Sequence, residues 1–166
     1  MKKNIFTGFI ILNTFLLSAQ SNLNFEIKNL IYSNYPNTNI ENTLLAINFW
    51  SVSDSKSRDL NKAFEKVAKT YEFAHLKGGS KGIVVLLINK DNLSSLANIS
   101  LSKDGIKKSI NLKLSDLKQN NSDLPSNIIF DSNGKIIYNN LEAINVFEKI
   151  NQLIDNNHKK TKTYHQ

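Results

Sequence analysis

The chain contains no cysteine among its 166 residues. A thiolate is the nucleophile of disulfide exchange and of thiol-based peroxide reduction, so both reactions are excluded. No disulfide can form, and folding is therefore independent of the redox poise of the compartment. Lipid attachment through an N-terminal cysteine is excluded in the same way.

Histidine is nearly as scarce, and its few copies do not form a metal-binding pattern. The three histidines are His75, His158 and His165, and no two of them share a His-x-x-x-His spacing. Only six glycines occur, and three of them fall in residues 77–82. That segment is not a phosphate-binding loop, because a strand pattern rather than a helix follows it. We therefore expect no metal and no cofactor.

The formal net charge of +7 overstates how basic the folded part is. Five lysines lie near the two ends, and leaving them out reduces the net charge to +2; they are Lys2, Lys3, Lys159, Lys160 and Lys162. No basic stripe with interleaved aromatic residues occurs, so nucleic acid is not an expected partner.

Residues 1–20 have the pattern of a secretory signal peptide. Two lysines precede an apolar stretch, Ile5–Leu17, and Ala19 offers a small residue for cleavage. The alternative is a membrane anchor, but the stretch is shorter than the roughly 20 residues that span a bilayer. We expect cleavage near Ala19 or Gln20, a periplasmic or secreted protein without a membrane span, a domain over 21–156 and a disordered basic tail over 157–166.

Two segments, 44–50 and 83–89, are almost continuously apolar and predict strands that are covered on both faces. Apolar residues at helical spacing predict a helix over 60–71. Further expected elements are a strand over 25–31, a helix within 92–108, a short strand over 110–114, a hairpin over 128–138 and a helix over 141–154. Asn133-Gly134 supplies the turn of the hairpin. Parallel strands joined by crossover helices, then an antiparallel pair, predict a three-layer α/β domain with a central mixed sheet.

Two stretches carry a resemblance to a known family. Residues 47–58 read Ile-Asn-Phe-Trp-Ser-Val-Ser-Asp-Ser-Lys-Ser-Arg, and residues 125–137 read Pro-Ser-Asn-Ile-Ile-Phe-Asp-Ser-Asn-Gly-Lys-Ile-Ile. They resemble V-N-F-W-A-T-W-C-P-P-C-R and P-T-T-F-L-I-D-x-x-G-K-I-V of the thioredoxin superfamily. The likeness is greatest to its exported thiol–disulfide oxidoreductases, the cytochrome-maturation and alkyl hydroperoxide reductase-like branch, and extends over roughly 24–156. It implies a thioredoxin-like fold.

The resemblance also shows what has changed. Asp54 and Ser57 stand where the family has the two cysteines of Cys-x-x-Cys, and Ser53 replaces the usual tryptophan. Pro125 stands at the family's cis-proline, which the resemblance places opposite Asp54 with a cis bond to Leu124.

We therefore expect a redox-inactive monomer that binds an extended polypeptide in the cell envelope or persists as a divergent envelope module. The binding residues implied by the resemblance are Trp50, Asp54, Ser57 and Pro125, with Val52 and Leu124 beside them. Each also has a structural interpretation: Trp50 as core, Asp54 as a helix start, Ser57 as a small residue in the same turn, and Pro125 as a turn residue. The alternative function is an enzyme with unrecognised chemistry in the former redox pocket. A Ser-His-Asp triad is not favoured, because Asp54 and Ser57 are one helical turn apart and no Gly-x-Ser-x-Gly motif occurs.

Overall fold

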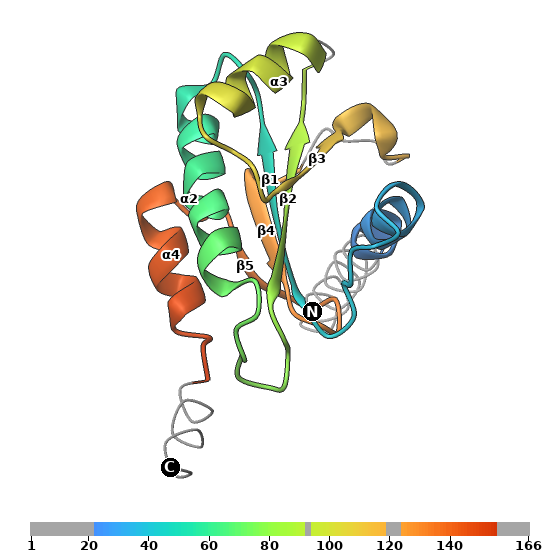
Figure 1. The fold of residues 1–166 in the computed structure, drawn as a ribbon, viewed down its shortest axis with the longest axis vertical. Helices are drawn as coiled ribbons and strands as arrows, with labels where there is room; N and C mark the ends of the chain where they lie inside the picture. Colours follow the sequence, from blue (N-terminus) through green and yellow to red (C-terminus); the bar gives the residue numbers. More distant parts are fainter. Residues whose placement is uncertain (1–21, 92–93, 119–123, 156–166) are drawn as a thin grey trace, which may run out of the picture. The chain divides into compact units, whose positions relative to one another are not determined.

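A computed structural model of the chain describes residues 22–91, 94–118 and 124–155 (Figure 1). The expected signal peptide and the expected tail fall outside these residues. The chain divides into two compact units, 1–38 and 39–166. Within the part of the chain that the structure describes, no helix is both long enough and apolar enough to cross a membrane.

The described part of the first unit, residues 22–38, forms a helix over 22–34 followed by a turn at 36–37. The strand predicted over 25–31 is therefore wrong. Leu23, Ile27 and Ile31 recur every four residues, which is the spacing of a helix face, and all three are buried. The period becomes visible only when Leu23, which precedes the predicted strand, is included.

The second unit is built on a five-stranded sheet with the order β3-β2-β1-β4-β5. The strands are β1 (Leu44–Trp50), β2 (Ile83–Asn89), β3 (Ile110–Lys113), β4 (Asn127–Phe130) and β5 (Ile136–Asn139). β1, β2 and β3 are parallel to one another, whereas β4 runs antiparallel to β1 and to β5. The two central strands match the predicted bounds residue for residue, and the mixed sheet is confirmed.

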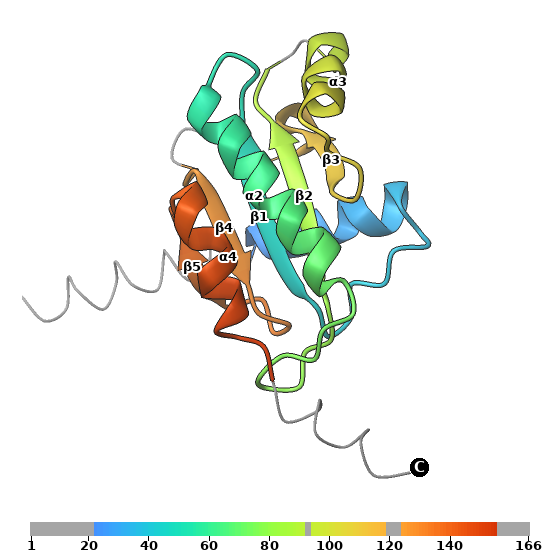
Figure 2. The same cartoon turned by 60° about the vertical axis from the view of Figure 1, so that its left-hand side comes forward.

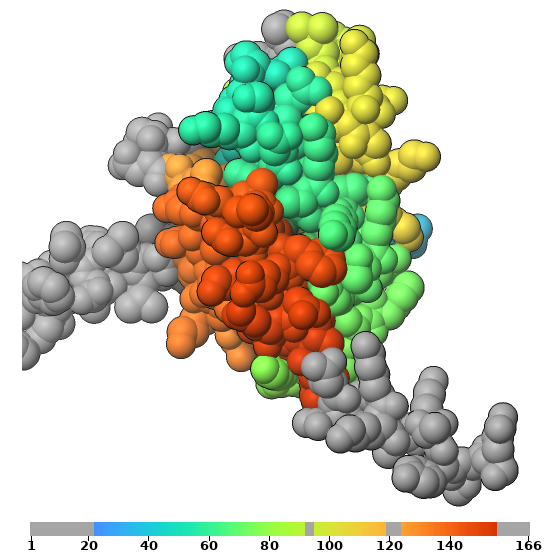
Figure 3. Space-filling view, turned by 90° about the vertical axis from the view of Figure 1, so that its left-hand side faces the viewer, coloured from blue at the N-terminus to red at the C-terminus, as the bar shows by residue number. Residues whose placement is uncertain are grey.

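Three α-helices belong to this unit: α2 (Ser55–Tyr71), α3 (Ser94–Lys103) and α4 (Ala143–Asn151). A short 3₁₀ turn, η1 (Leu114–Asp116), follows β3. Figures 1 and 2 place α2 and α4 side by side on one face of the sheet, and Figure 3 shows them as one continuous surface. The rings of Tyr71 and Phe147 pack between these two helices with their centroids 5.3 Å apart.

The core on this face comes from alternate positions of the central strands and from the apolar side of α2. Ala46 and Trp50 of β1 and Leu87 of β2 pack with Phe64 and Val67 of α2. All five side chains are buried. Only one side of α2 is buried, so apolar residues recur along it with a period of 3.6. Both faces of β1 and β2 are covered, so these strands are apolar almost throughout.

Glycines with positive φ lie in the turns and connectors of the sheet. Gly105 (φ +73°) follows α3, and Gly134 (φ +81°) lies in the hairpin turn. A third glycine, Gly82 (φ +78°), belongs to the connector before β2. A Cβ at Gly82 would overlap the carbonyl oxygen of Glu72, so this close approach excludes any side chain.

A buried carboxylate fastens α2 to the segment before β3. Glu65 accepts hydrogen bonds from the main-chain N–H groups of Lys107, Lys108 and Ser109 and from the Ser109 hydroxyl. Lys69 adds an ion pair at 3.1 Å. Burial by itself would raise the pKa of Glu65, but these hydrogen bonds outweigh it and lower the pKa to about 2.

Candidate functional site

The candidate site lies at the edge of the sheet where β1 and β2 end. Because the two strands are parallel, the residues that follow them meet at this edge. The loop 51–54 leads from β1 into α2, and Asp91 follows β2. The segment 124–126 enters β4 at the same edge, because β4 runs antiparallel to β1 and its first residue pairs with Asn48.

Asp54 is the N-cap of α2. Its backbone is extended (φ −95°, ψ 102°), and its Oδ1 accepts hydrogen bonds from the N–H groups of Lys56 (3.0 Å) and Ser57 (3.3 Å). A carboxylate is favoured here because the first N–H groups of a helix have no partners within the helix and the helix dipole is positive at this end. The side chain is exposed, so one face of it remains open to solvent.

Ser57 is buried, and its hydroxyl is occupied by the main chain. Its Oγ donates to the carbonyl oxygen of Asp54 at 2.9 Å and accepts from the N–H of Ser51 at 3.2 Å. The hydroxyl therefore closes the turn between the loop and the helix. Among the described residues, the hydroxyl donates to main-chain carbonyl oxygens and to no basic side chain, which is not the arrangement of an activated nucleophile.

The carboxylate of Asp91 holds the loop in place. It accepts from the N–H of Val52 at 2.6 Å and from the hydroxyl of Ser51 at 2.8 Å. Asn89 supports it from the end of β2, through a bond of 3.1 Å from the N–H of Asp91 to the Asn89 side chain. Burial alone would raise the pKa of Asp91, but these donors stabilise the anion and the pKa is lowered.

A buried amide, Asn48, joins β1 to the start of α2. Its Nδ2 donates to the carbonyl oxygen of Ser57 at 2.9 Å and to Oδ1 of Asn61 at 2.7 Å. Both asparagines are fully buried. This explains why a polar residue interrupts an otherwise apolar strand: it fixes where the helix begins relative to the sheet.

Trp50 ends β1 as a core residue. Its side chain is fully buried, and its carbonyl oxygen accepts from the N–H of Lys90 at 2.8 Å. The structural interpretation of Trp50 thus agrees with its position, and the indole is not exposed to a polypeptide on the surface.

Pro125 lies at the same edge, but its peptide bond is not cis. None of the peptide bonds in the described residues is cis, and these include Leu124–Pro125. The expected cis bond is therefore wrong; the trans form is the default even before proline, and the resemblance alone did not determine the isomer. Next to it, Ser126 accepts from the N–H of Phe49 at 2.9 Å and donates its own N–H to Asn140 at 2.8 Å.

The structure does not assemble a hydrolytic triad from the residues it describes. His75 follows the far end of α2, a helix of 17 residues and therefore about 25 Å long, whereas Asp54 and Ser57 lie at its start. His158 and His165 lie outside the described residues. Within those residues, no group of three or more His, Asp or Glu side chains is placed to hold a metal ion.

An ion pair braces the start of α2 against the end of α3. Arg58 binds Asp104 through two parallel hydrogen bonds, Nε to Oδ2 at 2.9 Å and Nη2 to Oδ1 at 2.7 Å. The bonds from Arg58 lower the pKa of Asp104. Arg58 belongs to the first stretch of resemblance, and this ion pair fixes its side chain beside the start of α2.

Sequence reasoning missed Asp91. Its position in the sequence could have indicated this role. Asp91 follows the strand 83–89, and the residues after two neighbouring parallel strands lie close together, so Asp91 is expected beside the loop that follows 44–50. The resemblance directed attention to Asp54 and Ser57 instead, whereas the residue that holds the loop comes from another part of the chain.

No family model matches the sequence, and no curated protein matches it. Solved structures do resemble it. The thioredoxin domain of a thiol-disulfide oxidoreductase from Bacteroides vulgatus is 16% identical, with a TM-score of 0.56 over 70% of this chain and 82% of that one. A thiol:disulfide interchange protein from Bacteroides sp. is 15% identical, with a TM-score of 0.56 over 74% and 81%. A secreted disulfide oxidoreductase from Mycobacterium tuberculosis is 11% identical, with a TM-score of 0.53 over 69% and 84%.

The fold is therefore thioredoxin-like, as the two stretches of resemblance implied. The similar proteins are oxidoreductases by name, but this chain has no cysteine and therefore no thiol for disulfide exchange. The site consists of the end of β1, the loop 51–54 and the start of α2 with its N-cap Asp54. It contains a carboxylate and a hydroxyl where that chemistry needs two thiols.

Proposed function

We propose that this protein is a non-catalytic thioredoxin-like module that binds an extended polypeptide in the cell envelope. The proposed surface consists of the loop 51–54 and the segment 124–126, which lie at one edge of the sheet. Binding there is non-covalent, because no side chain of the chain can form a mixed disulfide.

The observation that carries the proposal is the loop before α2, which hydrogen bonds hold from three sides. Asp91, Ser57 and the Asp54 cap all hold it, although no reactive group remains for it to position. A loop held by this many hydrogen bonds loses little conformational entropy on binding. Val52, Leu124 and Pro125 are only partly buried and offer apolar contact area.

The open carboxylate of Asp54 sets the preference for the partner. An exposed anion at the centre of a binding surface favours a basic segment, and charge of this kind acts on partner choice more than on affinity. Trp50 and Ser57 belong to the support of the surface, since both are buried.

The proposal includes export. Residues 1–20 have the charged start, short apolar stretch and small residue of a cleavable signal peptide. Expression in a Gram-negative host, followed by intact-mass measurement of the exported protein, tests this part separately. The expected product begins near residue 20 or 21, and a product that retains residues 1–17 contradicts export by cleavage.

Binding is tested with residues 21–166 as bait in an extract of the cell envelope, followed by calorimetry with a peptide from the captured protein. The double variant Asp54→Lys with Pro125→Thr is expected to weaken binding at least tenfold. The matched control is Asp59→Lys, which makes the same charge change at an exposed position of the same helix. Circular dichroism establishes that all three proteins are folded.

The control is expected to bind like the parent. If the double variant binds the peptide as tightly as the parent while remaining folded, the binding surface is elsewhere and the proposal fails. An equal loss in Asp59→Lys would instead show a general charge effect, which also contradicts a defined site.

A further inference from the structure

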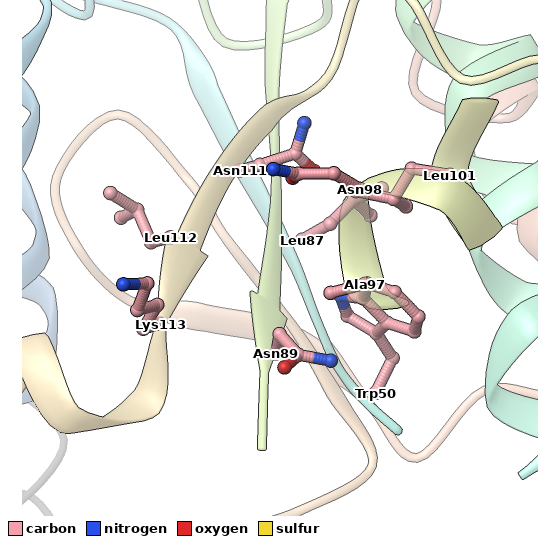
Figure 4. A pocket seen from close by; sticks show the side chains of 9 residues that line it. All are labelled: Trp50, Leu87, Asn89, Ala97, Asn98, Leu101, Asn111, Leu112 and Lys113. Atoms are coloured by element: carbon pink, nitrogen blue, oxygen red, sulfur yellow. The ribbon is translucent and has the colours of Figure 1, made fainter. Parts of the chain in front are cut away.

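A cavity of about 230 Å³ lies beneath α3, separate from the loop 51–54 and the segment 124–126. Its lining comes from the end of β1, from β2 and β3, and from α3 (Figure 4). In the sheet, β2 and β3 lie on one side of β1 and β4 lies on the other, so the cavity lies on the side of β1 away from β4. Nothing in the proposed polypeptide surface accounts for it.

The floor of the cavity is apolar and its rim is polar. Leu87, Ala97 and Leu101 are buried and form the floor together with Trp50. Asn98 and Lys113 line it as well but are exposed, so they mark the side that opens to solvent. An apolar floor with a few polar groups at the rim is typical of small-molecule sites.

The indole N–H of Trp50 has no partner. Its side chain is fully buried, and Nε1 is one of the few buried polar atoms among the described residues without a hydrogen bond. Figure 4 shows the nitrogen-bearing edge of the indole turned toward the other labelled side chains of the lining. A buried donor without an acceptor is costly, and a ligand that supplies an acceptor removes that cost.

The charges of the lining favour an anion. Lys113 is the cationic residue of the lining, and no aspartate or glutamate lines the cavity. Asp116 accepts from the main-chain N–H of Lys113, but no carboxylate of the described residues lies within ion-pair distance of the Lys113 ammonium. The side-chain amide of Asn89 already donates to the carboxylate of Asp91 at 3.4 Å. The available donors are therefore the indole N–H, the Lys113 ammonium and the amide of Asn98.

The volume limits the size of the ligand. An apolar cavity of about 150 Å³ accepts benzene, and sites for drug-sized ligands begin near 300 Å³. A cavity between these sizes accommodates one ring or a short branched chain with a small head group.

We propose that this cavity binds a small organic carboxylate with an apolar body the size of one ring. The body packs on Leu87, Ala97 and Leu101, while the carboxylate accepts from the Trp50 indole. Lys113, which Figure 4 shows across β2 and β3 from the indole, adds its positive charge at the rim. This site shares Trp50 with the support of the proposed polypeptide surface but includes none of residues 51–54 or 124–126, so either proposal can fail without the other.

The chain has a single tryptophan, which makes the test direct. The probe is cyclohexanecarboxylate, which does not absorb where the indole is excited, titrated into residues 21–166. The indole N–H resonance in a ¹H–¹⁵N spectrum and the fluorescence emission are both expected to shift and to saturate, with a dissociation constant on the order of 1 mM for about nine heavy atoms. Cyclohexylmethanol, the neutral counterpart, is expected to bind about fivefold more weakly.

Two pairs of variants locate the site. Asn98→Phe blocks the rim and is expected to abolish the saturable shift, whereas Ile99→Phe adds the same ring at the adjacent exposed position of α3, outside the lining, and leaves it unchanged. Lys113→Met is expected to weaken the carboxylate about fivefold and to leave the alcohol unaffected. Lys135→Met, in the turn between β4 and β5, is its control.

A shift of the indole resonance that rises linearly without saturation in the parent overturns the site. Equal binding by Asn98→Phe and Ile99→Phe overturns its location. If the alcohol binds as tightly as the carboxylate and Lys113→Met changes neither, the cavity does not select anions and the proposed ligand class is wrong.

Discussion

The carboxylate of Asp91 lies 2.6 Å from the main-chain nitrogen of Val52, 39 positions earlier in the chain. This bond joins the ends of two neighbouring parallel strands and holds the loop that leads from β1 into α2. Asp91 contacts the loop but not Asp54 itself. Its contribution is therefore to position the surface rather than to act on a partner.

Removing this carboxylate is expected to loosen the loop without unfolding the domain. Asp91→Ala leaves the N–H of Val52 and the hydroxyl of Ser51 without their acceptor, at a cost of about 1–2 kcal/mol in the free energy of unfolding. Hydrogen exchange at the Val52 amide is expected to accelerate far more than at Val85 in the centre of β2. Equal acceleration at both amides would mean global destabilisation and would contradict a local role. Asp59→Ala, at an exposed position, serves as the control.

The N-cap of α2 is a second measurable contribution. Asp54→Ala is expected to lower the free energy of unfolding by about 1 kcal/mol, whereas Asp54→Ser retains an acceptor for the helix N–H groups and costs only a few tenths. Urea denaturation of the two variants and the parent gives the comparison. Equal losses from alanine and serine would show that the carboxylate, rather than the cap, is what the helix requires.

Introducing thiols tests whether the start of α2 can support dithiol chemistry. The pair Asp54→Cys and Ser57→Cys is expected to form a disulfide that dithiothreitol reduces reversibly, because the helix start lowers the pKa of a cysteine thiol. The control pair, Asp59→Cys and Lys62→Cys, has the same spacing inside the helix and lacks the extended N-cap backbone. The parent should show no disulfide-reductase activity above buffer. Equal oxidation of both pairs would falsify the idea that this helix start is special.

Glu65 predicts a specific dependence of stability on pH. Its pKa is about 2 in the folded protein against an ordinary 4.5, so its contribution is fully present above about pH 4.5 and is lost as the pH falls through 2. The difference corresponds to roughly 3 kcal/mol. Glu65→Gln is expected to flatten this part of the stability profile by about that amount.

The matched control for this profile is Glu142→Gln. Glu142 is exposed, and its side chain makes no capping hydrogen bond. Its substitution should leave the slope between pH 5 and pH 2 unchanged. Thermal unfolding followed by circular dichroism at a series of pH values separates the two variants, and parallel profiles for both would contradict the assignment to Glu65.

The sequence by itself determined that thiol chemistry is excluded and where the two central strands of the sheet lie. A missing cysteine excludes thiol chemistry in any fold, and continuous apolar runs over 44–50 and 83–89 need burial on both faces, which a parallel sheet provides. The capping role of Asp54 also followed from local sequence, because an N-cap depends only on the residues of the next turn. Each of these properties is local or compositional.

The tertiary structure decided what depends on residues far apart in the chain. The structure has a helix over 22–34 where a strand was predicted. A short run of apolar residues can fit both the strand period of 2 and the helix period of 3.6, and only a longer window separates them. The trans bond before Pro125 was fixed by the fold and not by the residue type. Asp91 beside Val52, and the unpartnered indole of Trp50 over a cavity, arise only when β1, β2 and α3 pack together. No periodicity or motif records such contacts, because sequence patterns describe which face a residue occupies and not which distant residue it meets.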